Sequence, residues 1–313
     1  MINKSDRILI TGGTGLIGKN LTRELKSQGY EILATGSEVD LRESYKVNNL
    51  FLDYKPTVVY HLAAKVGGIF ANVNYKSQFY SDNVLINTHV VNACKLSNVR
   101  YVFAMGTGCA YPKRLESEIL NESDYLDGIP ESTNDAYAYA KRGLLVHLKA
   151  LAESMDLKYI FCLPANIYGP YDNFHPRHSH VIPGLIRRFC DSKLRNEKSI
   201  SIWGNGTAKR DFLFIDDCIE AVLALSKSNC NGVFNVGTSE LTSIKDLSYL
   251  IKSATGFNGD VEFDVNMPSG QMQRIFDCSG VRALGWKPKV TLSDGIEKTV
   301  NWFVENRDVI REY

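Results

Sequence analysis

A glycine-rich stretch near the N-terminus constrains the fold of this chain more than any other feature. Residues 11–18 read Thr-Gly-Gly-Thr-Gly-Leu-Ile-Gly. An apolar, β-branched run, Arg7–Thr11, precedes this stretch, and a helical pattern over Gly15–Gly29 follows it. A strand, a glycine-rich loop and a helix in this order are typical of the first βα unit of a dinucleotide-binding domain, where the helix N-terminus presents N–H donors to a pyrophosphate.

Each glycine of this loop has its own expected role. Gly12 permits a tight turn, Gly15 lets the pyrophosphate approach the backbone, and Gly18 lets the helix pack closely against the sheet. The alternative is a structural turn that binds no nucleotide, but the position of the triplet between a strand and a helix favours the nucleotide. We therefore predict a cofactor-binding loop that contains Gly12, Gly15, Leu16, Ile17 and Gly18.

The first half of the chain alternates short apolar runs with helical patterns. Further strands are predicted at Glu31–Thr35, Thr57–Ala63, Arg100–Met105 and Lys158–Pro164, and further helices near Asn83–Leu96 and at Ala136–Ser154. This alternation indicates βαβ units, and continuous apolar runs such as Val58-Val59-Tyr60 suit parallel strands buried on both faces. The predicted fold class is α/β, a Rossmann-type doubly wound parallel sheet.

The sequence changes in character after Pro164. Residues 166–210 are rich in His, Pro, Gly and Arg, which predicts loops with one short helix, Val181–Phe189, while Phe212–Ala224 and Val233–Val236 resemble a return to the sheet. We expect a dinucleotide-binding domain at residues 1–165 with a return segment at about 211–237. Residues 166–210 and 238–313 would form a smaller C-terminal substrate-binding lobe.

Composition excludes several classes of partner. The formal net charge of +1 gives no general attraction to nucleic acid or to an anionic membrane. No apolar run reaches the roughly 18 residues that a membrane span needs, and the polar N-terminus does not resemble a signal peptide. Seven cysteines without a CxxC pair predict reduced thiols and a cytoplasmic protein.

The end of the second predicted strand, Ala34–Ser37, bears on cofactor choice. An acidic residue here would bind the ribose 2′-OH of NAD and repel the 2′-phosphate of NADP. The stretch contains no acid before Glu38 and no arginine, whereas Ser37 offers a hydroxyl to a phosphate. We therefore predict NADP(H) as the favoured cofactor, with NAD(H) as the alternative. Asp40 and Leu41 are expected near the adenine.

Tyr137 and Lys141 form the first candidate catalytic pair. Their i, i+4 spacing at the start of a predicted helix puts both side chains on one face, whereas Tyr139 lies on another. Reduction of a ketone needs a proton donor, and a free tyrosine has a pKa of about 10. A nearby ammonium group would lower that pKa by stabilising the phenolate. The alternative is a pair of surface side chains without a catalytic role.

The predicted strand Arg100–Met105 leads into Gly-Thr-Gly-Cys-Ala-Tyr-Pro, which offers the hydroxyl of Thr107. Ligands of parallel α/β sheets bind beyond the carboxyl ends of the strands. Thr107 is therefore a candidate third member of a carbonyl-reducing site with Tyr137 and Lys141.

At this point the chain resembles the extended short-chain dehydrogenase/reductases that modify nucleotide sugars, and within them the GDP-L-fucose synthase family, the GDP-4-keto-6-deoxymannose 3,5-epimerase-4-reductases. The resemblance covers nearly the whole chain. The segments that carry it are His61-Leu-Ala-Ala-Lys-Val-Gly-Gly68, Cys109-Ala-Tyr-Pro112, Asn173-Phe-His-Pro-Arg-His-Ser-His-Val-Ile-Pro183, Trp203-Gly-Asn-Gly-Thr207, Arg210-Asp-Phe212 and Gly285-Trp286.

The resemblance implies a catalytic set. The reductase triad would be Thr107, Tyr137 and Lys141, while Cys109 and His180 would be the base and acid of epimerisation. Protons at C3 and C5 of a 4-keto sugar are acidic because the C4 carbonyl delocalises the carbanion, so a thiolate can remove one and an imidazolium can return one. Tyr137 and Thr107 would stabilise the enolate as they polarise O4.

The resemblance also implies the ligands and the assembly. A GDP-linked 4-keto sugar would contact Asn166, Arg188, Trp203, Arg210 and Arg274, and the cofactor would contact Ala63, Lys141 and His180 as well as the glycine loop. Arginine offers a planar donor fork to a diphosphate, although surface salt bridges are the alternative role for each arginine. A homodimer is expected, with the helices near residues 84–97 and 136–154 paired across a two-fold axis.

The chain departs from the family pattern at Thr107-Gly108, where two serines are usual. Threonine keeps the hydroxyl, but its β-methyl group restricts χ1. Gly108 removes a second hydroxyl and is expected to enlarge the site, which favours a larger substrate. A C4-reductase that acts on a GDP-4-keto heptose or another modified GDP-sugar, without epimerisation, is therefore the alternative function.

Three other hypotheses are weaker. His175, His178 and His180 lack a recognised metal-ligand spacing, so no metal site is predicted. A dehydratase would need an acidic pair where Gly108 and Cys109 stand. An epimerase that retains NAD, or a non-catalytic dinucleotide sensor, would not consume NADPH, which makes the loss of absorbance at 340 nm the discriminating observation.

Overall fold

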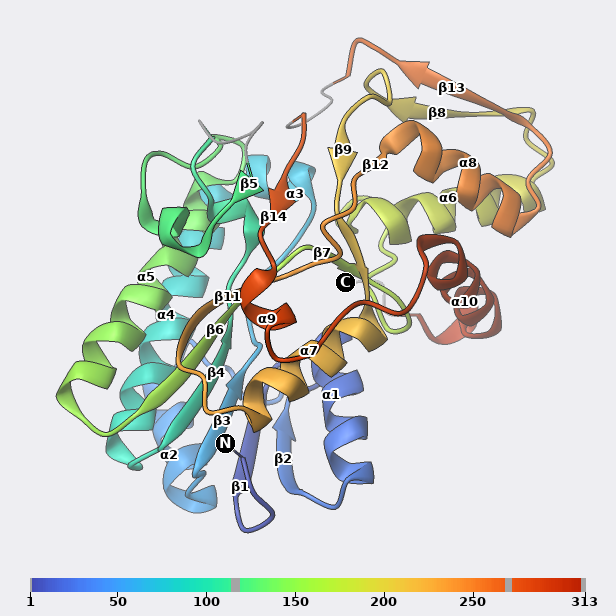
Figure 1. Ribbon diagram of the computed structural model, residues 1–313. Helices are drawn as coiled ribbons and strands as arrows, with labels where there is room; N and C mark the ends of the chain where they lie inside the picture. Colours follow the sequence, from blue (N-terminus) through green and yellow to red (C-terminus); the bar gives the residue numbers. More distant parts are fainter. Residues whose placement is uncertain (1, 114–118, 268–271, 311–313) are drawn as a thin grey trace.

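The computed structural model describes residues 2–113, 119–267 and 272–310. A parallel six-stranded sheet forms its centre, with the strand order β11-β6-β4-β3-β1-β2 (Figure 1). The strands are β1 (Arg7–Thr11), β2 (Glu31–Thr35), β3 (Val58–His61), β4 (Tyr101–Met105), β6 (Lys158–Pro164) and β11 (Gly232–Val236). This parallel, doubly wound sheet confirms the predicted Rossmann-type fold class.

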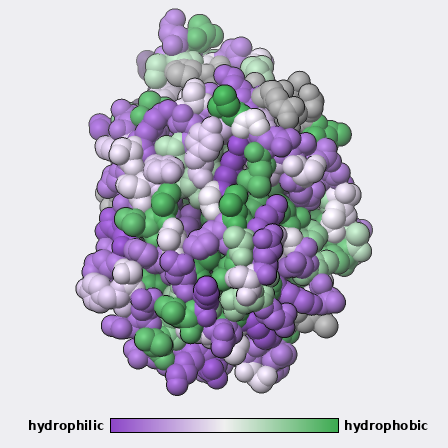
Figure 2. Space-filling view, turned by 90° about the vertical axis from the view of Figure 1, so that its left-hand side faces the viewer, coloured by the Kyte–Doolittle hydropathy of each residue, from purple (hydrophilic) through white to green (hydrophobic). Residues whose placement is uncertain are grey.

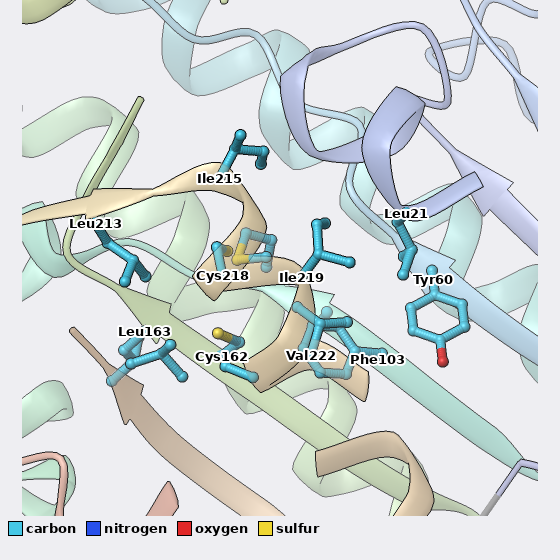
Figure 3. Close-up of a cluster of buried hydrophobic side chains, with 14 of the residues drawn as sticks. Leu21, Tyr60, Phe103, Cys162, Leu163, Leu213, Ile215, Cys218, Ile219 and Val222 are labelled. Carbon is cyan, nitrogen blue, oxygen red and sulfur yellow. The ribbon is translucent and has the colours of Figure 1, made fainter. Parts of the chain in front are cut away.

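Helices cover both faces of this sheet because its central strands are apolar on both sides. On one side lie α2 (Ser44–Tyr54), α4 (Lys76–Leu96) and α5 (Asp135–Ser154), and on the other α1 (Leu16–Ser27) and α7 (Ile215–Lys227) (Figure 1). Side chains of α7 and α1 pack on the sheet in a continuous core (Figure 3). Labelled members of this core are Leu21, Tyr60, Phe103, Cys162, Leu163, Ile215, Cys218, Ile219 and Val222.

The chain reverses its direction of travel across the sheet at β1. From β1 it moves to β2 on one side and then crosses to β3 on the other, so β1 lies between the two. In open α/β sheets a crevice forms at such a switch point, beyond the carboxyl ends of the strands. The glycine loop and the segment that follows β3 meet at this point.

The remainder of the chain forms small sheets and helices beyond the carboxyl ends of the strands. Two-stranded sheets pair β7 (Asn166–Tyr168) with β10 (Phe212–Phe214), β8 (Ser199–Trp203) with β13 (Asp260–Asp264), β9 (Lys209–Arg210) with β12 (Thr242–Ser243), and β5 (Ile119–Leu120) with β14 (Ile275–Phe276). The longer helices here are α6 (Val181–Leu194), α8 (Ile244–Thr255) and α10 (Leu292–Glu305).

Short helices complete the described chain: α3 (Ile69–Asn74), η1 (Gly108–Ala110), η3 (Glu122–Leu126), α9 (Ser279–Arg282) and η4 (Arg307–Val309). Within the described ranges, no helix is both long enough and apolar enough to cross a membrane.

The structure corrects some of the predicted elements. Phe212–Ala224 is not a strand of the main sheet, since only β10 is extended and α7 begins at Ile215. Helix α6 continues to Leu194, five residues beyond the predicted Phe189. Helix α2 and strands β7, β8 and β9 were not predicted. The two- and three-residue strands are too short to show a periodic pattern, and their pairing depends on distant segments.

Candidate active site

Two glycines of the N-terminal loop are required by protein packing. Gly12 has a φ of +72°, and a Cβ atom there would lie 2.7 Å from the amide nitrogen of Ala63, after β3. A Cβ atom at Gly18 would overlap the carbonyl of Gly12 and lie 2.6 Å from Cα of Gly13. The loop, the first turn of α1 and the end of β3 are therefore held at a spacing that only glycine allows.

Gly15 differs from these two glycines because nothing in the protein requires it. A Cβ atom there would meet only the carbonyl oxygen of Gly12, at an ordinary 3.5 Å. Gly15 is the N-cap residue of α1, and no side chain caps the helix. An exposed helix N-terminus that no side chain caps is a suitable site for the pyrophosphate of a dinucleotide. Binding of a pyrophosphate would explain Gly15, which protein packing does not require. Leu16 and Ile17 are half-buried in the first turn.

The end of β2 carries a carboxylate, contrary to the expectation from Ala34–Ser37. Glu38 turns back so that its carboxylate accepts a hydrogen bond from the Gly36 amide at 2.5 Å. A Cβ atom at Gly36 would lie within 2.8 Å of both Glu38 and Thr14, so this carboxylate lies beside the glycine loop. Ser37 is exposed next to it. The local chain reversal brings an acid from two residues downstream to this position.

The segment after β2 also contains an arginine that sequence reasoning overlooked. Arg42 forms an ion pair with Asp40 at 2.7 Å and lies 3.5 Å from Asp82. The hydrogen bond from Arg42 lowers the pKa of Asp40 to about 2. Leu41 is buried in the core, and its carbonyl lies 3.1 Å from Nδ1 of His89. The buried side chain of Leu41 is therefore not available to a ligand.

A buried hydrogen-bond chain connects the glycine loop to α5. Asn87 on α4 donates to the carbonyl of Ala140 at 3.2 Å, so its oxygen accepts from Nε2–H of His61 at 3.0 Å. Nδ1 of His61 then accepts from the Thr11 hydroxyl at 2.8 Å. Burial lowers the pKa of His61 to about 3, with the nearby Lys141 charge adding to the effect, so the ring is neutral.

Tyr137 and Lys141 lie on one face of α5, close to the end of β4. The Lys141 ammonium is 5.9 Å from the centre of the Tyr137 ring and donates to the carbonyl of Met105 at 2.7 Å. Lys141 is 1% exposed, while Tyr137 is half-buried with the edge of Phe79 against its ring. Tyr139 is exposed on another face, as predicted from the spacing.

The electrostatics of this pair differ from the expectation. Burial raises the pKa of Tyr137, and the nearby Cys109 thiol raises it further. Burial also lowers the pKa of Lys141 to about 8. Desolvation therefore controls the pKa values of both Tyr137 and Lys141. Tyr137 is held protonated at neutral pH, as a proton donor must be.

The turn after β4 presents Thr107 and Cys109 beside this pair. Thr107 is the N-cap residue of η1, and its hydroxyl oxygen accepts from the Cys109 amide at 3.2 Å. The Cys109 side chain is half-buried. Helix α5, which carries Tyr137, packs directly against η1, which carries Cys109. The structure thus brings Thr107, Cys109, Tyr137 and Lys141 to the same edge of the sheet.

Gly108 does not enlarge the site, which corrects the sequence-based expectation. It is buried, and a Cβ atom there would lie 2.5 Å from Cζ of Phe276. The Phe276 ring is itself buried and comes from β14, far along the chain. An aromatic side chain therefore fills the volume that a serine at position 108 would use, and the glycine is explained by packing.

His180 begins α6 as its N-cap residue and is exposed to solvent. Its loop packs against the segment after β3, because the Gly68 amide donates to the carbonyl of His178 at 3.1 Å. A Cβ atom at Gly67, the neighbouring residue, would lie 3.3 Å from Cζ of Phe79, the ring that touches Tyr137. This packing places the loop of His180 beside Phe79, which touches Tyr137. Although the His180 side chain is open to solvent, the protein around it partly desolvates the ring and lowers its pKa.

The predicted substrate contacts lie in three separate parts of the described chain. Asn166 and Arg210 lie near each other, since Asn166 donates twice to the carbonyl of Asp211. Arg188 donates to the carbonyl of Ser201 in β8, the strand that ends at the half-exposed Trp203. These residues come from β7, β9, α6 and β8.

Arg274 forms the third group and reaches the catalytic turn. It is 8% exposed, and its Nη1 donates to the carbonyl of Gly108 at 2.5 Å. Its Nη2 is buried and has no hydrogen-bond partner among the residues that the structure describes. Among the described residues, no group of three His, Cys, Asp or Glu side chains could hold a metal ion.

One buried residue of the site was missed entirely by the sequence analysis. Arg142 follows Lys141 and binds the carbonyl of Ala110 at the end of η1. Its burial was predictable, since Ala138 and Leu145 lie four residues before it and three residues after it on the same face of α5 and are buried. A charged residue within such an apolar stripe signals a buried polar contact.

Comparison with known proteins identifies the family of this chain. Residues 8–237, from β1 to the end of β11, match the model of a family described as the NAD-dependent epimerase/dehydratase family. The chain belongs to this family, the extended short-chain dehydrogenase/reductases. GDP-L-fucose synthase 1 of Arabidopsis thaliana is 36% identical over 309 residues, which cover 98% of this chain and 95% of the relative.

Two solved structures of family members resemble this one closely. A GDP-L-fucose synthetase from Naegleria fowleri bound to NADP has a TM-score of 0.89 and 32% identity, with 99% of this chain and 96% of the other covered. A GDP-6-OMe-4-keto-L-xylo-heptose reductase from C. jejuni has a TM-score of 0.90 and 26% identity, with 97% and 99% covered. The relatives are thus NAD(P)-dependent epimerases and reductases of nucleotide sugars.

Proposed function

We propose that this family member reduces C4 of a GDP-4-keto-6-deoxy sugar with NADPH, and that it also epimerises C3 and C5. The observation that carries this proposal is the grouping of Tyr137, Lys141, Thr107 and Cys109 at the carboxyl edge of the sheet. A sensor or a purely binding protein does not need a protonated, half-buried tyrosine beside a buried lysine. The similarity to GDP-L-fucose synthases supports the choice of sugar.

The reductive step follows from the chemistry of these side chains. When bound, the dinucleotide supplies a hydride to C4 of the sugar. The hydroxyl of Tyr137 donates the proton to O4, and the raised pKa keeps that proton available at neutral pH. Thr107 donates a hydrogen bond to the same oxygen. Lys141 donates one N–H to the carbonyl of Met105. Its other two N–H groups would donate to ribose hydroxyls of the cofactor.

Epimerisation would use the same polarised carbonyl. With O4 held by Tyr137 and Thr107, the thiolate of Cys109 removes the proton from C3 or C5, and the imidazolium of His180 returns one from the opposite face. The enolate charge then rests on O4 while the configuration changes. The lowered pKa of His180 helps release of its proton once the ring is charged.

The diphosphate of the sugar nucleotide would be held by arginines of the C-terminal part. Arg188, Arg210 and Arg274 provide charge and planar donor forks, with Asn166 and Trp203 beside them. Nη2 of Arg274 supports this role because it is buried and finds no hydrogen-bond partner within residues 2–113, 119–267 and 272–310. The proposed lobes are residues 1–165 with 211–237 for the cofactor, and 166–210 with 238–313 for the GDP-sugar.

We propose NADP(H) as the favoured cofactor, with NAD(H) as the alternative cofactor. NADP in the Naegleria fowleri structure supports the first choice, and the carboxylate of Glu38 beside Gly36 and Thr14 supports the second. Because a carboxylate repels a 2′-phosphate, Glu38→Gln should raise the ratio of kcat/KM for NADPH to that for NADH by about 5–10-fold. An unchanged ratio would show that Glu38 does not face the ribose.

Turnover in D2O tests the two halves of the activity separately. The protein is incubated with GDP-4-keto-6-deoxymannose and NADPH, and the product is analysed by NMR while absorbance at 340 nm reports NADPH. We expect stoichiometric NADPH loss and deuterium at C3 and C5. Cys109→Ser should remove the deuterium and keep measurable reduction, whereas Tyr137→Phe should remove the reduction. NADPH loss without deuterium would leave a reductase only.

A second candidate is C4 reduction of a GDP-4-keto heptose without epimerisation. It rests on the TM-score of 0.90 to the C. jejuni heptose reductase, and no longer on extra space at Gly108, which Phe276 fills. The D2O experiment with a GDP-4-keto heptose in place of the hexose distinguishes the two. A kcat/KM at least about ten-fold higher for the heptose would favour this second function.

A further inference from the structure

Arg142 is the buried cation that the proposed mechanism leaves without a role. It lies on α5, directly after Lys141, and is 6% exposed. Nε and Nη2 both donate to the carbonyl of Ala110, at 2.9 and 2.6 Å. Nη1 donates to the carbonyl of Gly128 at 2.7 Å, and Nη2 also donates to that of Asp127 at 2.8 Å.

All four of these hydrogen bonds end on backbone carbonyls. Burial disfavours the charged guanidinium and lowers the pKa of Arg142, so the hydrogen bonds must offset a desolvation cost. Apolar residues fill the neighbouring positions of the same face, at Ala138 and Leu145. An apolar side chain at position 142 would complete the stripe without that cost, so stability alone does not explain the arginine.

The geometry of its hydrogen bonds explains why an arginine stands at position 142. Ala110 ends η1, the turn whose N-cap is Thr107 and whose middle residue is Cys109. Arg142 therefore ties the turn that carries Thr107 and Cys109 to the helix that carries Tyr137. Arg274 holds the same turn from the opposite end, through the carbonyl of Gly108.

We infer that Arg142 is a positioning residue that fixes the turn of Thr107 and Cys109 against Tyr137, and so sets the balance between proton exchange at C3/C5 and reduction at C4. This inference rests on the proposed function. Tyr137 and Lys141 stay on α5 when the arginine is removed, whereas Cys109 loses its support. Exchange should therefore suffer more than reduction.

The planar guanidinium is suited to this task in a way that an ammonium is not. Arginine presents a rigid fork of N–H donors and here spans the carbonyls of Ala110, Asp127 and Gly128 at once. A lysine at the same position keeps the charge, but its single ammonium group cannot bind all three carbonyls at once. Arg142→Lys should thus be an intermediate variant, and Arg142→Met the full loss.

Three variants test the inference: Arg142→Met, Arg142→Lys and, as a matched control, Lys149→Met, which removes an exposed cation from the same helix. For Arg142→Met we expect kcat for reduction to fall about 10–100-fold, since a shift of about 1 Å costs that much. The Kd for NADPH and the substrate KM should stay within about two-fold, because the glycine loop is untouched. The ratio of deuterium incorporation to reduction should fall, less so in Arg142→Lys, and stay constant in Lys149→Met.

A readout that does not need turnover separates failure of the inference from failure of the proposed function. Cys109 is a half-buried free thiol, so its alkylation by iodoacetamide can be followed by mass spectrometry at several pH values. Loss of a tie worth roughly 1 kcal/mol should speed alkylation of Cys109 about five-fold in Arg142→Met. Cys230, also half-buried, should react at an unchanged rate.

The outcomes are distinct. If the wild-type protein reduces no GDP-4-keto sugar, the proposed function fails and the alkylation of Cys109 still decides the role of Arg142. If folded Arg142→Met matches wild type in alkylation, kcat and exchange ratio, the inference is overturned. If Arg142→Met does not fold, as judged by circular dichroism, Arg142→Lys carries the same comparison, and wild-type values for it would overturn the inference equally.

Discussion

Lys141 shows at the scale of a single residue that the candidate site keeps a buried charge at a cost in stability. Its ammonium is 1% exposed and has the Met105 carbonyl as its hydrogen-bond acceptor. Burial lowers its pKa from 10.5 to about 8, which corresponds to a penalty of about 3 kcal/mol for the charged form. A fold that keeps such a group at neutral pH does so for another reason than stability.

We therefore predict that Lys141→Met makes the protein more stable and nearly inactive. At pH 7 the gain should be about 1–2 kcal/mol, because the removed penalty of about 3 kcal/mol is partly offset by a Met105 carbonyl left without its donor. Reduction should fall by about 10²–10⁴-fold. Urea unfolding and NADPH oxidation measure the two effects, with Lys149→Met as the control. A less stable variant would contradict the prediction.

The same shift predicts a pH dependence with a definite sign. Below about pH 8, Lys141 is protonated in both the folded and unfolded chain, and the penalty is complete. Between about pH 8 and 10.5 only the unfolded chain keeps this proton, so the contribution of Lys141 to stability improves as pH rises. The advantage of Lys141→Met should shrink through this window. Reduction by wild type should decline above about pH 8 as the ammonium is lost.

Gly108 yields a prediction about packing across distant segments. Because a Cβ atom would lie 2.5 Å from Phe276, Gly108→Ser should destabilise the protein by about 1–3 kcal/mol rather than add a substrate contact. In a Phe276→Leu background the serine should cost less, since the smaller side chain gives room. A double-mutant cycle measured by urea unfolding tests this coupling. Strictly additive effects would show that the two residues do not compete for the volume.

At the scale of the element, the unit β1–loop–α1 combines packing and binding in one short segment. Gly12 and Gly18 are fixed by contacts within the protein, while Gly15 faces open space at the helix N-terminus. The same glycine repeat therefore serves two purposes, and substitution can separate them.

Gly15→Ala and Gly18→Ala should accordingly have opposite signatures. Gly15→Ala should leave the free energy of unfolding within about 0.5 kcal/mol of wild type, since φ is −80° and the nearest atom lies at 3.5 Å, yet weaken NADPH binding about ten-fold or more. Gly18→Ala should destabilise the fold by about 1–3 kcal/mol. Calorimetric titration measures the affinity for NADPH, and urea unfolding measures the free energy of unfolding. Equal stability losses would rule out the distinction.

At the scale of the whole molecule, α4 and α5 present an outer surface that the described chain does not cover. The face that contains α5 shows apolar side chains among polar ones (Figure 2). On α5, Tyr139 is 45% and Val146 53% exposed, at i, i+7 spacing, with the exposed Gly143 between them. A glycine inside a helix costs about 1 kcal/mol relative to alanine. Close approach of a second helix would explain it.

We predict a homodimer through this face, and Gly143→Ala tests it. A Cβ atom at Gly143 meets nothing within 4 Å, so in a monomer the alanine should stabilise the helix by about 1 kcal/mol with no change in mass. In a dimer whose helices pack there, it should raise the dimer dissociation constant, as should Val146→Glu. Light scattering over a micromolar dilution series decides. A wild-type monomer at all concentrations would refute the dimer.

The sequence alone determined the features that depend on local periodicity and spacing. The strand, glycine loop and helix at residues 7–29 follow from composition at neighbouring positions, as does the shared face of Tyr137 and Lys141. Alternating strands and helices then require a parallel sheet, which places the turn with Thr107 at its carboxyl edge. The fold class and the location of the site were therefore predictable.

Only the tertiary structure decided what occupies the space around those residues. Phe276 fills the volume beside Gly108, Glu38 turns back to Gly36, and Arg142 binds carbonyls of a separate turn. Burial, rather than the neighbouring charge, controls the pKa of Tyr137. These properties depend on which distant segments come together and how much water they exclude, and no local pattern in a sequence encodes either quantity.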